Sequence, residues 1–384
     1  MLTEKELEAA IALIINRIGD VNRLLIRKIA AQLLKIGELN ATSINRLIVM
    51  TDMNADIREI TRELAKATSM NIREMNMIYQ AALNDSYTDP RFKTALQSQP
   101  LTPRQNMRIV QFAQNVATQT AQTMTNLSNT TAVMPVYREA VDKAITVVSM
   151  GGQSYQEAAR EIIRDLGYNG LQVQYESGYH RRLDSAVRQN IIDGVNQINQ
   201  NASLAMGEAL GFDAVEISAH ANSAPDHEPV QGRIFLKAEF EKMQAGEPFQ
   251  DVNGNQYEGF RRAIGEWNCM HIAMSFDTKT SIPRYTEEEL EQFKANNAKG
   301  CDIGGRHYTI YEARQLMRQL ETKVRREKDA ANAARLNGND MDARRAHQKT
   351  INRLSAQYYA VAKAAGLTPR GQRLSVEGFK MVNV

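Results

Sequence analysis

Cysteine is almost absent from this sequence, which has only Cys269 and Cys301 among its 384 residues. Two cysteines are too few for a disulfide framework, so each is interpreted as a free thiol or as a ligand. Long apolar runs are missing as well, because no stretch approaches the roughly 18 to 20 residues that cross a bilayer. The first residues lack the charged and then apolar layout of a signal peptide. We therefore expect a globular protein without a membrane segment.

The common catalytic signatures are also missing. There is no phosphate-binding P-loop, no dinucleotide-binding glycine pattern after a strand, no nucleophile elbow and no helical histidine pair of the metalloprotease kind. No tandem repeat is evident at the periods of solenoid proteins. These absences argue against the familiar enzyme classes, and we expect no small-molecule substrate.

Charge is unevenly distributed along the chain. The net charge is only +3, but the residues from Arg306 to the C-terminus contain 16 Lys and Arg against 7 Asp and Glu. The stretch from Pro90 to Arg138 has no acidic residue and is rich in Gln, Asn and Thr. Such a surface is compatible with a neighbouring nucleic acid or another negatively charged surface. We prefer the interpretation that it is a neutral solvated helix.

Apolar residues recur at helical spacing over most of the chain. From Leu7 to Ile36 they form one stripe of a long amphipathic helix, in which Gly19 predicts a kink or a break. Capping residues and prolines mark where several later helices begin, for example Asn71 and Pro103. Further helices are expected at about 42–51, 54–67, 71–84, 103–127, 135–150, 154–166, 182–210, 310–336 and 341–365.

The sequence changes character between about 168 and 300. Alternating apolar and polar residues, separated by Gly, Pro and Asn, predict short strands at 171–175, 212–218, 233–236, 256–260 and 270–276. We therefore predict an α+β fold that is predominantly α-helical. Its predicted parts are an N-terminal helical region (1–150), a central mixed α/β core (151–304) and a C-terminal basic helical hairpin with a tail (305–384).

The residues best suited to chemistry gather in two segments of the predicted core. The first contains His220, Asp226 and His227, and the second contains Cys269 and His271. With a strand at 270–276, Cys269 and His271 would project to the same face because strand side chains alternate. His220 and His227 would complete a tetrahedral zinc site of one sulfur and three nitrogens, with Asp226 as an outer partner or a replacement ligand.

Two other interpretations of these residues remain open. In the first, the polar side chains form hydrogen bonds to loop backbone, Trp267 and Phe276 pack in the core, and Cys269 is a small buried apolar residue. In the second, Asp226 or His227 acts as a general base, or holds a metal-activated water, for phosphodiester or similar hydrolysis. The sequence names no substrate for such an enzyme.

The predicted C-terminal hairpin carries basic side chains suited to contacting a partner. They would neutralise DNA phosphates in a salt-dependent way, but interspersed acids such as Glu321, Glu327 and Asp329 weaken that interpretation. We prefer a charged hairpin that packs against a partner subunit. The candidate interaction residues are Arg314, Arg318, Arg325, Arg326, Arg344 and Arg345.

A series of motifs occurs in a fixed order along the chain. It reads Tyr175-Glu-Ser-Gly178-Tyr-His-Arg181-Arg-Leu-Asp184, Arg188, Glu216-Ile-Ser-Ala-His220, Asp226-His227, Gln231-Gly232 and Asn268-Cys269-Met-His271. In this order the motifs resemble the phage minor capsid protein 2 family, which is related to the Mu-F-like head morphogenesis proteins. Weaker similarity extends to the N-terminal helices and to Gly366-Leu-Thr-Pro-Arg370. Ala224 and Val230 depart from the family pattern, which tends to have arginine and tryptophan there, so an enzyme role that needs this arginine is in doubt.

The resemblance implies a virion structural protein of low copy number, associated with the portal region of the phage head, that assists capsid assembly and DNA packaging or delivery. The implied partners are portal and major capsid proteins, with packaged DNA nearby. The implied location is the virion, after a period in the host cytoplasm. In the related proteins, Cys and His elements look placed like Asp226-His227 and Cys269-His271, which favours zinc by analogy. The alternatives are a metal-dependent hydrolase or nuclease and a plain DNA-binding protein.

Overall fold

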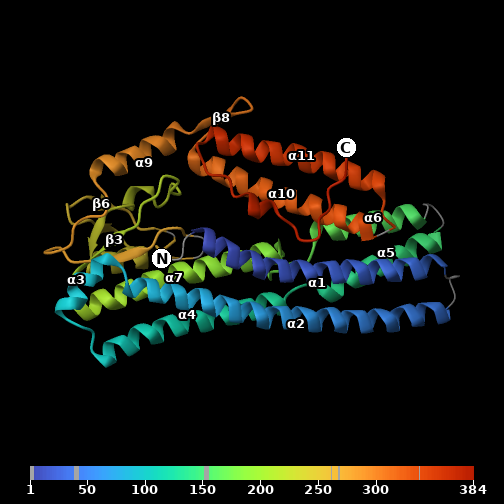
Figure 1. Cartoon of the computed structure of the whole chain (residues 1–384), viewed down its shortest axis with the longest axis horizontal. Helices are drawn as coiled ribbons and strands as arrows, with labels where there is room; N and C mark the ends of the chain where they lie inside the picture. Colours follow the sequence, from blue (N-terminus) through green and yellow to red (C-terminus); the bar gives the residue numbers. More distant parts are fainter. Residues whose placement is uncertain (1–3, 39–42, 151–154, 261, 267–268, 337) are drawn as a thin grey trace. The chain divides into compact units, whose positions relative to one another are not determined.

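A computed structural model describes residues 4–38, 43–150, 155–260, 262–266, 269–336 and 338–384 (Figure 1). Helices dominate these residues, and the predicted fold class, a predominantly helical α+β protein, is confirmed. The α-helices are α1 (Glu4–Glu38), α2 (Ser43–Tyr87), α3 (Pro90–Ser98), α4 (Pro103–Asn129), α5 (Val133–Met150), α6 (Tyr155–Asn169), α7 (Leu183–Leu210), α8 (Lys237–Ala245), α9 (Glu287–Lys299), α10 (Ile310–Leu336) and α11 (Met341–Ala364). The strands are β1 (Gln172–Gln174), β2 (His180–Arg182), β3 (Ala214–Ile217), β4 (Ile234–Leu236), β5 (Phe249–Gln250), β6 (Gln256–Tyr257), β7 (Ala273–Phe276), β8 (Cys301–Ile303) and β9 (Arg306–Tyr308). Two 3-10 helices are η1 (Glu228–Val230) and η2 (Gly371–Leu374).

The chain divides into two compact units, each assembled from separated stretches. The first unit contains Met1–Ala10, Arg73–Thr123 and Gln189–Gln315, and the second contains Ile11–Ile72, Met124–Arg188 and Leu316–Val384. The helices α1, α2, α4, α7 and α10 contribute residues to both units. Each unit therefore draws on all three predicted sequence regions, whose boundaries stay a prediction.

The predicted apolar stripe of α1 is buried within the second unit. Ile14, Ile18, Leu25 and Leu33 are at most 5% exposed. The break predicted at Gly19 is wrong, because α1 runs without interruption from Glu4 to Glu38. A glycine costs about 1 kcal/mol inside a helix, whereas each fully buried large apolar side chain contributes about 1.5–3 kcal/mol. The buried stripe therefore holds the helix together through this position.

The three helices predicted between 42 and 84 form a single helix, α2. No glycine or proline occurs between Ser43 and Tyr87, so nothing in this stretch terminates a helix. Asn71, expected to cap the last of the three, is instead buried inside α2 in the second unit. Its side chain accepts from Arg17 Nη1 at 3.3 Å and donates to Ile14 O at 3.5 Å. The predicted boundaries are wrong because this amide is satisfied by tertiary contacts rather than by a helix end.

The predicted C-terminal helical hairpin is confirmed, and Figure 1 shows α10 and α11 side by side. His347 Nδ1 lies 2.7 Å from Glu327 Oε2, and Tyr358 donates to Glu321 at 3.2 Å. The turn uses positive φ at Gly338 and Asn339, and the Asp340 side chain then accepts from Ala343 N to cap α11. Asn337 lies outside the described residues.

The first unit contains a three-stranded antiparallel sheet in the order β4-β3-β7. Its strands are shorter than the predicted ones at 212–218, 233–236 and 270–276, although each falls inside the predicted range. Helix α7 lies against β7, where Ser275 N donates to Ser203 Oγ at 3.0 Å. The approach is close, because a Cβ on Gly207 would lie 2.1 Å from Ser275 Oγ. An apolar cluster covers the sheet and includes Val215, Ile217, Val230, Phe235, Phe240, Met243, Phe249, Ile264 and Ala273. This packing fixes the ends of β3 and β7, from which the candidate site extends.

Candidate functional site

The predicted ligand residues His220, His227, Cys269 and His271 lie together in the first unit, and we call them the histidine cluster. The rings of His220 and His271 stack with centroids 4.3 Å apart, and the rings of His227 and His271 are 5.7 Å apart. Cys269 Sγ lies 3.4 Å from His227 Nδ1. His227, Cys269 and His271 are at most 2% exposed.

The cluster forms where β3 ends and β7 begins. In the antiparallel register Ile217 faces Ala273, so the residues after β3 meet those before β7. Ser218 N donates to Ile272 O, and Ile272 N donates to Ser218 Oγ, both at 2.9 Å. The argument from strand alternation is wrong in detail, because β7 begins at Ala273 and both Cys269 and His271 precede it. Strand pairing, rather than a shared strand face, brings the side chains together.

Hydrogen bonds fix the tautomers of two histidines. His271 Nδ1 lies 2.8 Å from the carbonyl oxygen of Ser218, which only accepts, so Nδ1 carries the proton. Its Nε2 is then an acceptor for the Ser223 hydroxyl at 2.8 Å. His227 Nε2 donates to Arg262 O at 2.8 Å, which leaves Nδ1 to accept from the Cys269 thiol. The cluster thus ties together the loops after β3 and before β7.

Burial keeps every member of the cluster neutral. Desolvation lowers the pKa of His271 to about 3 and that of His220 to about 4. It also lowers the pKa of His227 and raises that of the Cys269 thiol. The His227 and Cys269 pair is therefore imidazole and thiol, not imidazolium and thiolate. A nucleophilic cysteine needs the opposite shift of its pKa.

His220 is the cluster member with unused hydrogen-bonding capacity. Within the described residues, neither of its buried ring nitrogens has a partner at hydrogen-bond geometry, although the nearby Asn222 side chain raises the pKa of the ring against the larger effect of burial. Neutral imidazoles and a thiol are suitable zinc donors. However, no group of three or more His, Cys, Asp or Glu in the described part of the chain is arranged to hold a metal ion. Both nitrogens of His271 already form hydrogen bonds, so a zinc site requires ring rotation and stays a prediction.

Asp226 lies at the edge of the cluster rather than within it. Its side chain is 48% exposed and pairs with Arg262 Nη2 at 2.9 Å. The distance from its carboxylate to His227 Nε2 is 3.8 Å. Sequence patterns did not predict that Ser218, Ser223 and Arg262 form hydrogen bonds with the histidine cluster, although the two serines lie in the same segment as His220. Trp267 and Asn268 lie outside the described residues.

The remaining motif residues of this region make packing and hydrogen-bond contacts. Gln231 is buried, and its side-chain oxygen accepts from His220 N at 3.2 Å. Gly232 has φ +70°, and a Cβ there would lie 2.3 Å from a Leu290 methyl carbon. Val230 is fully buried in the apolar cluster, and Ala224 O accepts from His227 N at 3.0 Å. These contacts match the interpretation in which polar groups of the segment bind loop backbone.

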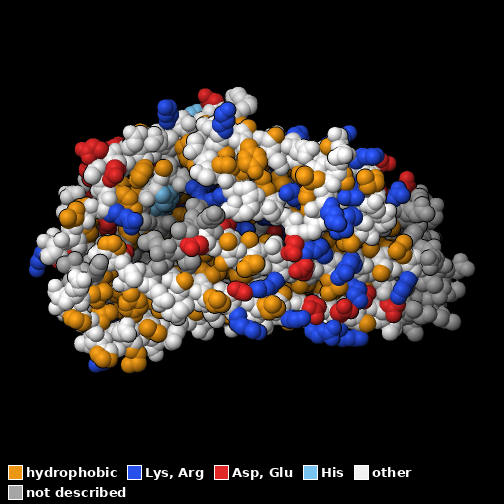
Figure 2. Space-filling model, viewed as in Figure 1, with side chains coloured by type: hydrophobic (Ala, Val, Ile, Leu, Met, Phe, Trp, Pro, Cys, Tyr) orange, Lys and Arg blue, Asp and Glu red, His pale blue; other side chains and the backbone are white. Residues whose placement is uncertain are grey.

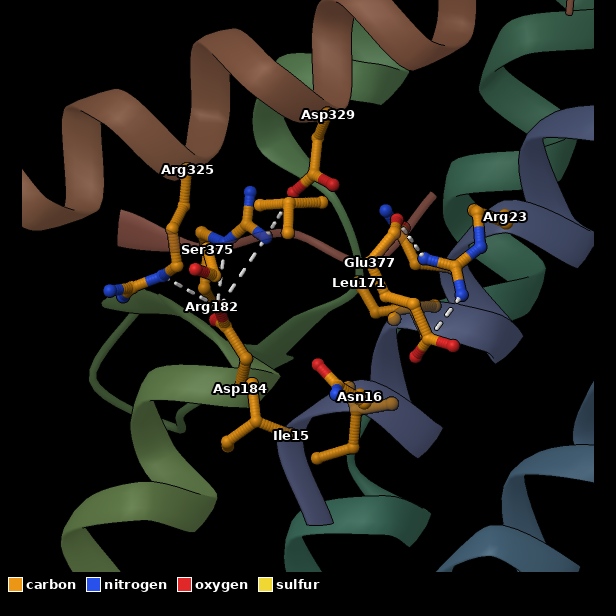
Figure 3. A pocket seen from close by; sticks show the side chains of 14 residues that line it. Ile15, Asn16, Arg23, Leu171, Arg182, Asp184, Arg325, Asp329, Ser375 and Glu377 are labelled. Atoms are coloured by element: carbon orange, nitrogen blue, oxygen red, sulfur yellow. Dashed lines mark hydrogen bonds and ion pairs between the residues drawn. The ribbon is translucent and has the colours of Figure 1, made fainter. Parts of the chain in front are cut away.

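A second group of motif residues forms a buried ionic network in the second unit. Arg182 contacts Asp184 at 3.1 Å and Asp329 at 2.6 Å, and Arg325 contacts Asp184 at 3.3 Å. All four are at most 8% exposed. Figure 3 shows them around a cavity of about 40 Å³, which Ser375 and Glu377 also line. The two arginines hold the pKa of Asp184 well below its usual range, against the effect of burial.

A family model described as phage minor capsid protein 2 matches residues 2–361. The chain belongs to this family. Comparison with curated proteins and with solved structures found no match. The histidine cluster and the Arg182 network both lie within the residues matched by the minor capsid protein 2 model. Membership gives the protein a structural role in the phage capsid. Among the described residues, no helix combines the length and apolarity needed to cross a membrane.

The candidate interaction arginines of this minor capsid protein are not equivalent. Arg325 and Arg344 are buried, and Arg326 lies over the ring of Tyr168 at 5.4 Å. Arg314 and Arg318 are half-buried, whereas the Arg345 side chain is 54% exposed and near Asp342. Figure 2 shows Lys and Arg interspersed with Asp and Glu on the visible face. The six arginines therefore do not present one continuous exposed basic stripe, and their role in partner binding stays a prediction.

Proposed function

We propose that this minor capsid protein is a low-copy component of the phage head, associated with the portal region, that assists capsid assembly and DNA packaging or delivery. The observation that carries the proposal is the family match over residues 2–361. The proposed partners are portal and major capsid proteins, with packaged DNA nearby. The proposed location is the virion, after a period in the host cytoplasm.

The surface of α4 in the first unit supports a role in assembly. From Gln111 to Thr123 this part of the helix has no charged residue, although many of its side chains are exposed. Met107 and Phe112 are 63% and 41% exposed. Depletion of charge together with exposed Met and aromatic residues is typical of protein interfaces. The apolar stripe of α1 is already buried within the second unit and is not exposed to a partner.

Loss of the protein during infection tests the proposed function. A phage with a nonsense codon early in this gene should produce shells that contain portal and major capsid protein but do not retain or deliver DNA. The parent phage grown on the same host is the control, and a plasmid copy of the gene should restore the yield. A normal yield of infectious particles without the protein would contradict the proposal.

Chemical cross-linking of intact heads tests the proposed position. We expect cross-links from this protein to the portal in excess of those to the major capsid protein. Cross-links spread evenly over the major capsid protein would contradict association with the portal region. Added lysine at exposed positions of α4, such as Gln119→Lys, offers a probe of that surface in the same experiment.

The hydrolase alternative gains no support from the geometry. His227 is fully buried, Cys269 is 2% exposed, and the pKa shifts of both favour their neutral forms. Purified protein should therefore leave DNA and virion polymers intact under conditions in which a reference nuclease is active. Turnover that is lost in His227→Ala would favour the enzyme over the structural role.

Zinc at the histidine cluster is a separate proposal, supported by the donor types and by the unpartnered nitrogens of His220. Elemental analysis of protein purified without added metal decides it. About one equivalent of zinc, lost in Cys269→Ser, would support the site. Less than about a tenth of an equivalent in folded protein would exclude it.

A further inference from the structure

The C-terminal segment, defined here as residues 370–384, returns over the second unit after α11. Gly366, with φ +64°, and Pro369 lie between the end of α11 and this segment. Figure 1 shows the chain running back beside α10 and α11. Arg373 and Leu374 are buried, but no residue from Ser375 to Val384 is buried. The outer ten residues are therefore held by side chains of the helices rather than by an apolar core of their own.

Basic side chains from α1, α10 and α11 hold the segment by its main-chain carbonyl groups. Arg23 Nη1 donates to Glu377 O at 2.8 Å, a contact near the centre of the segment that lies beside the pocket in Figure 3. The other three contacts are of the same kind. They are Arg325 to Arg373 O at 3.0 Å, Lys328 to Leu374 O at 2.8 Å and Arg344 to Lys380 O at 3.2 Å. These four contacts are made to the main chain, while the Glu377 carboxylate also lies 3.9 Å from Arg23 and the Phe379 ring lies 5.2 Å from Lys328.

Two of these cations have no carboxylate partner among the described residues. Lys328 contacts only Leu374 O and the ring of Phe379, and burial lowers its pKa. Arg344 is 8% exposed and contacts Asn339, Met341 Sδ and Lys380 O. A carbonyl dipole balances a buried cation less well than an anion does. The segment adds little negative charge, since Arg370, Arg373 and Lys380 accompany Glu377.

We propose that the C-terminal segment masks a groove for an extended polyanion, and that its displacement lets Arg23, Lys328 and Arg344 bind phosphates of a nucleic-acid backbone. The three cations reach the carbonyl groups of Leu374, Glu377 and Lys380 at intervals of three residues, around a turn at Glu377 and Gly378. Cations that meet one chain at successive points suit a repeated charge better than a single anion. All three cations lie within residues 2–361 that the family model matches, whereas the covering segment lies beyond them.

Deletion of residues 375–384 tests the masking, because it keeps the buried Arg373 and Leu374. The probe is a fluorescein-labelled 20-base-pair DNA duplex, titrated at several salt concentrations. We expect the deletion to tighten binding at low salt about tenfold, and to steepen the slope of log affinity against log salt by about two. Adding Arg344→Gln to the deletion should reverse most of the gain. Arg353→Gln, at an exposed position of the same helix, is the matched control and should change affinity less than twofold.

The intact chain gives an independent measurement, because DNA and the docked segment would compete for one groove. Trypsin should cleave full-length protein after Lys380 at least several times faster at saturating duplex than without it. Unchanged cleavage at saturating duplex would overturn the proposal, even where the deletion variant does not fold. Equal DNA binding by the folded deletion variant and the full chain would also overturn it. Binding of poly-glutamate but not DNA by the deletion variant would overturn the assignment to phosphates.

Discussion

His271 is held by two hydrogen bonds whose directions allow only one neutral tautomer. Sequence reasoning placed the four cluster residues together, because two segments rich in His and Cys flank neighbouring strands. It did not give the ring orientations, since these depend on Ser218 O and the Ser223 hydroxyl, which are ordinary loop groups in the sequence. The Arg182 network was missed for a different reason. Its partner Asp329 is 147 residues away along the chain, and no local pattern connects them.

Replacing His271 should destabilise the first unit. His271→Ala removes both hydrogen bonds and leaves the Ser218 carbonyl and the Ser223 hydroxyl without these partners, at a cost of about 2–4 kcal/mol. Urea denaturation followed by circular dichroism measures the change. His307→Ala is the control, because that side chain is 55% exposed, and its effect should stay within about 0.5 kcal/mol. A loss below about 1 kcal/mol for His271→Ala would contradict a structural role of the cluster.

Stability should fall on mild acidification. The folded pKa values of His220 and His271 lie near 4 and 3, below the unfolded value of about 6.5. Unfolding therefore takes up protons below pH 6.5, so the stabilisation is complete above pH 6.5 and is lost as the pH falls towards 4. Urea midpoints measured with a chelator present should show uptake of about two protons by His220 and His271 near pH 5, to which His227 adds because burial lowers its pKa too. His271→Gln should reduce this number by about one, and a flat profile from pH 6.5 to 5 would argue against neutral buried histidines.

Breaking the buried ionic network should strongly destabilise the second unit. Arg182→Ala leaves Asp329 without its 2.6 Å partner and removes one of the two arginines beside Asp184. Removing one member of a buried ion pair typically costs about 3–5 kcal/mol. Arg345→Ala, which removes an exposed arginine, is the control and should be nearly neutral. A thermal midpoint of Arg182→Ala equal to that of the control would show that the network does not stabilise the fold.

At the scale of elements, the sequence predicted which segments are helices or strands better than it predicted where they begin and end. The hairpin of α10 and α11 and the positions of β1, β3, β4 and β7 follow from periodicity and turn residues. The fusion of three predicted helices into α2 does not, because tertiary contacts at Asn71 override a local capping pattern. The hairpin β8–β9 was not predicted at all, although the Gly304-Gly305 pair at its turn is a recognised hairpin signature.

Replacing either of two helical glycines with alanine should change the stability of the protein, in opposite directions at the two positions. A Cβ on Gly207 would lie 2.1 Å from Ser275 Oγ, in the contact between α7 and β7. Gly207→Ala should therefore destabilise the protein by about 1–3 kcal/mol. At Gly19 the nearest atom is Arg23 Nη1 at 3.4 Å, an ordinary van der Waals contact, so Gly19→Ala should stabilise the protein by up to about 1 kcal/mol. Thermal melts of both variants provide the comparison, and a shift in the same direction for both would refute this explanation.

At the scale of the whole molecule, the order of motifs in the sequence identified the family. It did not show which segments of the chain lie together in space. Each compact unit is assembled from three separated stretches, and helices such as α2 and α7 supply residues to both. Hydrophobic periodicity shows which side of a helix is buried, but not which distant segment buries it. The motifs around Asp184 and His220 belong to different units, so each has its own structural explanation.

Quantitative mass spectrometry of purified, DNA-filled heads tests the proposed function most directly. We predict that the protein co-purifies with heads through a density gradient, in a constant ratio to the portal protein and at far fewer copies than the major capsid protein. Heads with portal and major capsid protein at normal levels but without this protein, while it remains in the lysate, would contradict its role as a minor component of the virion.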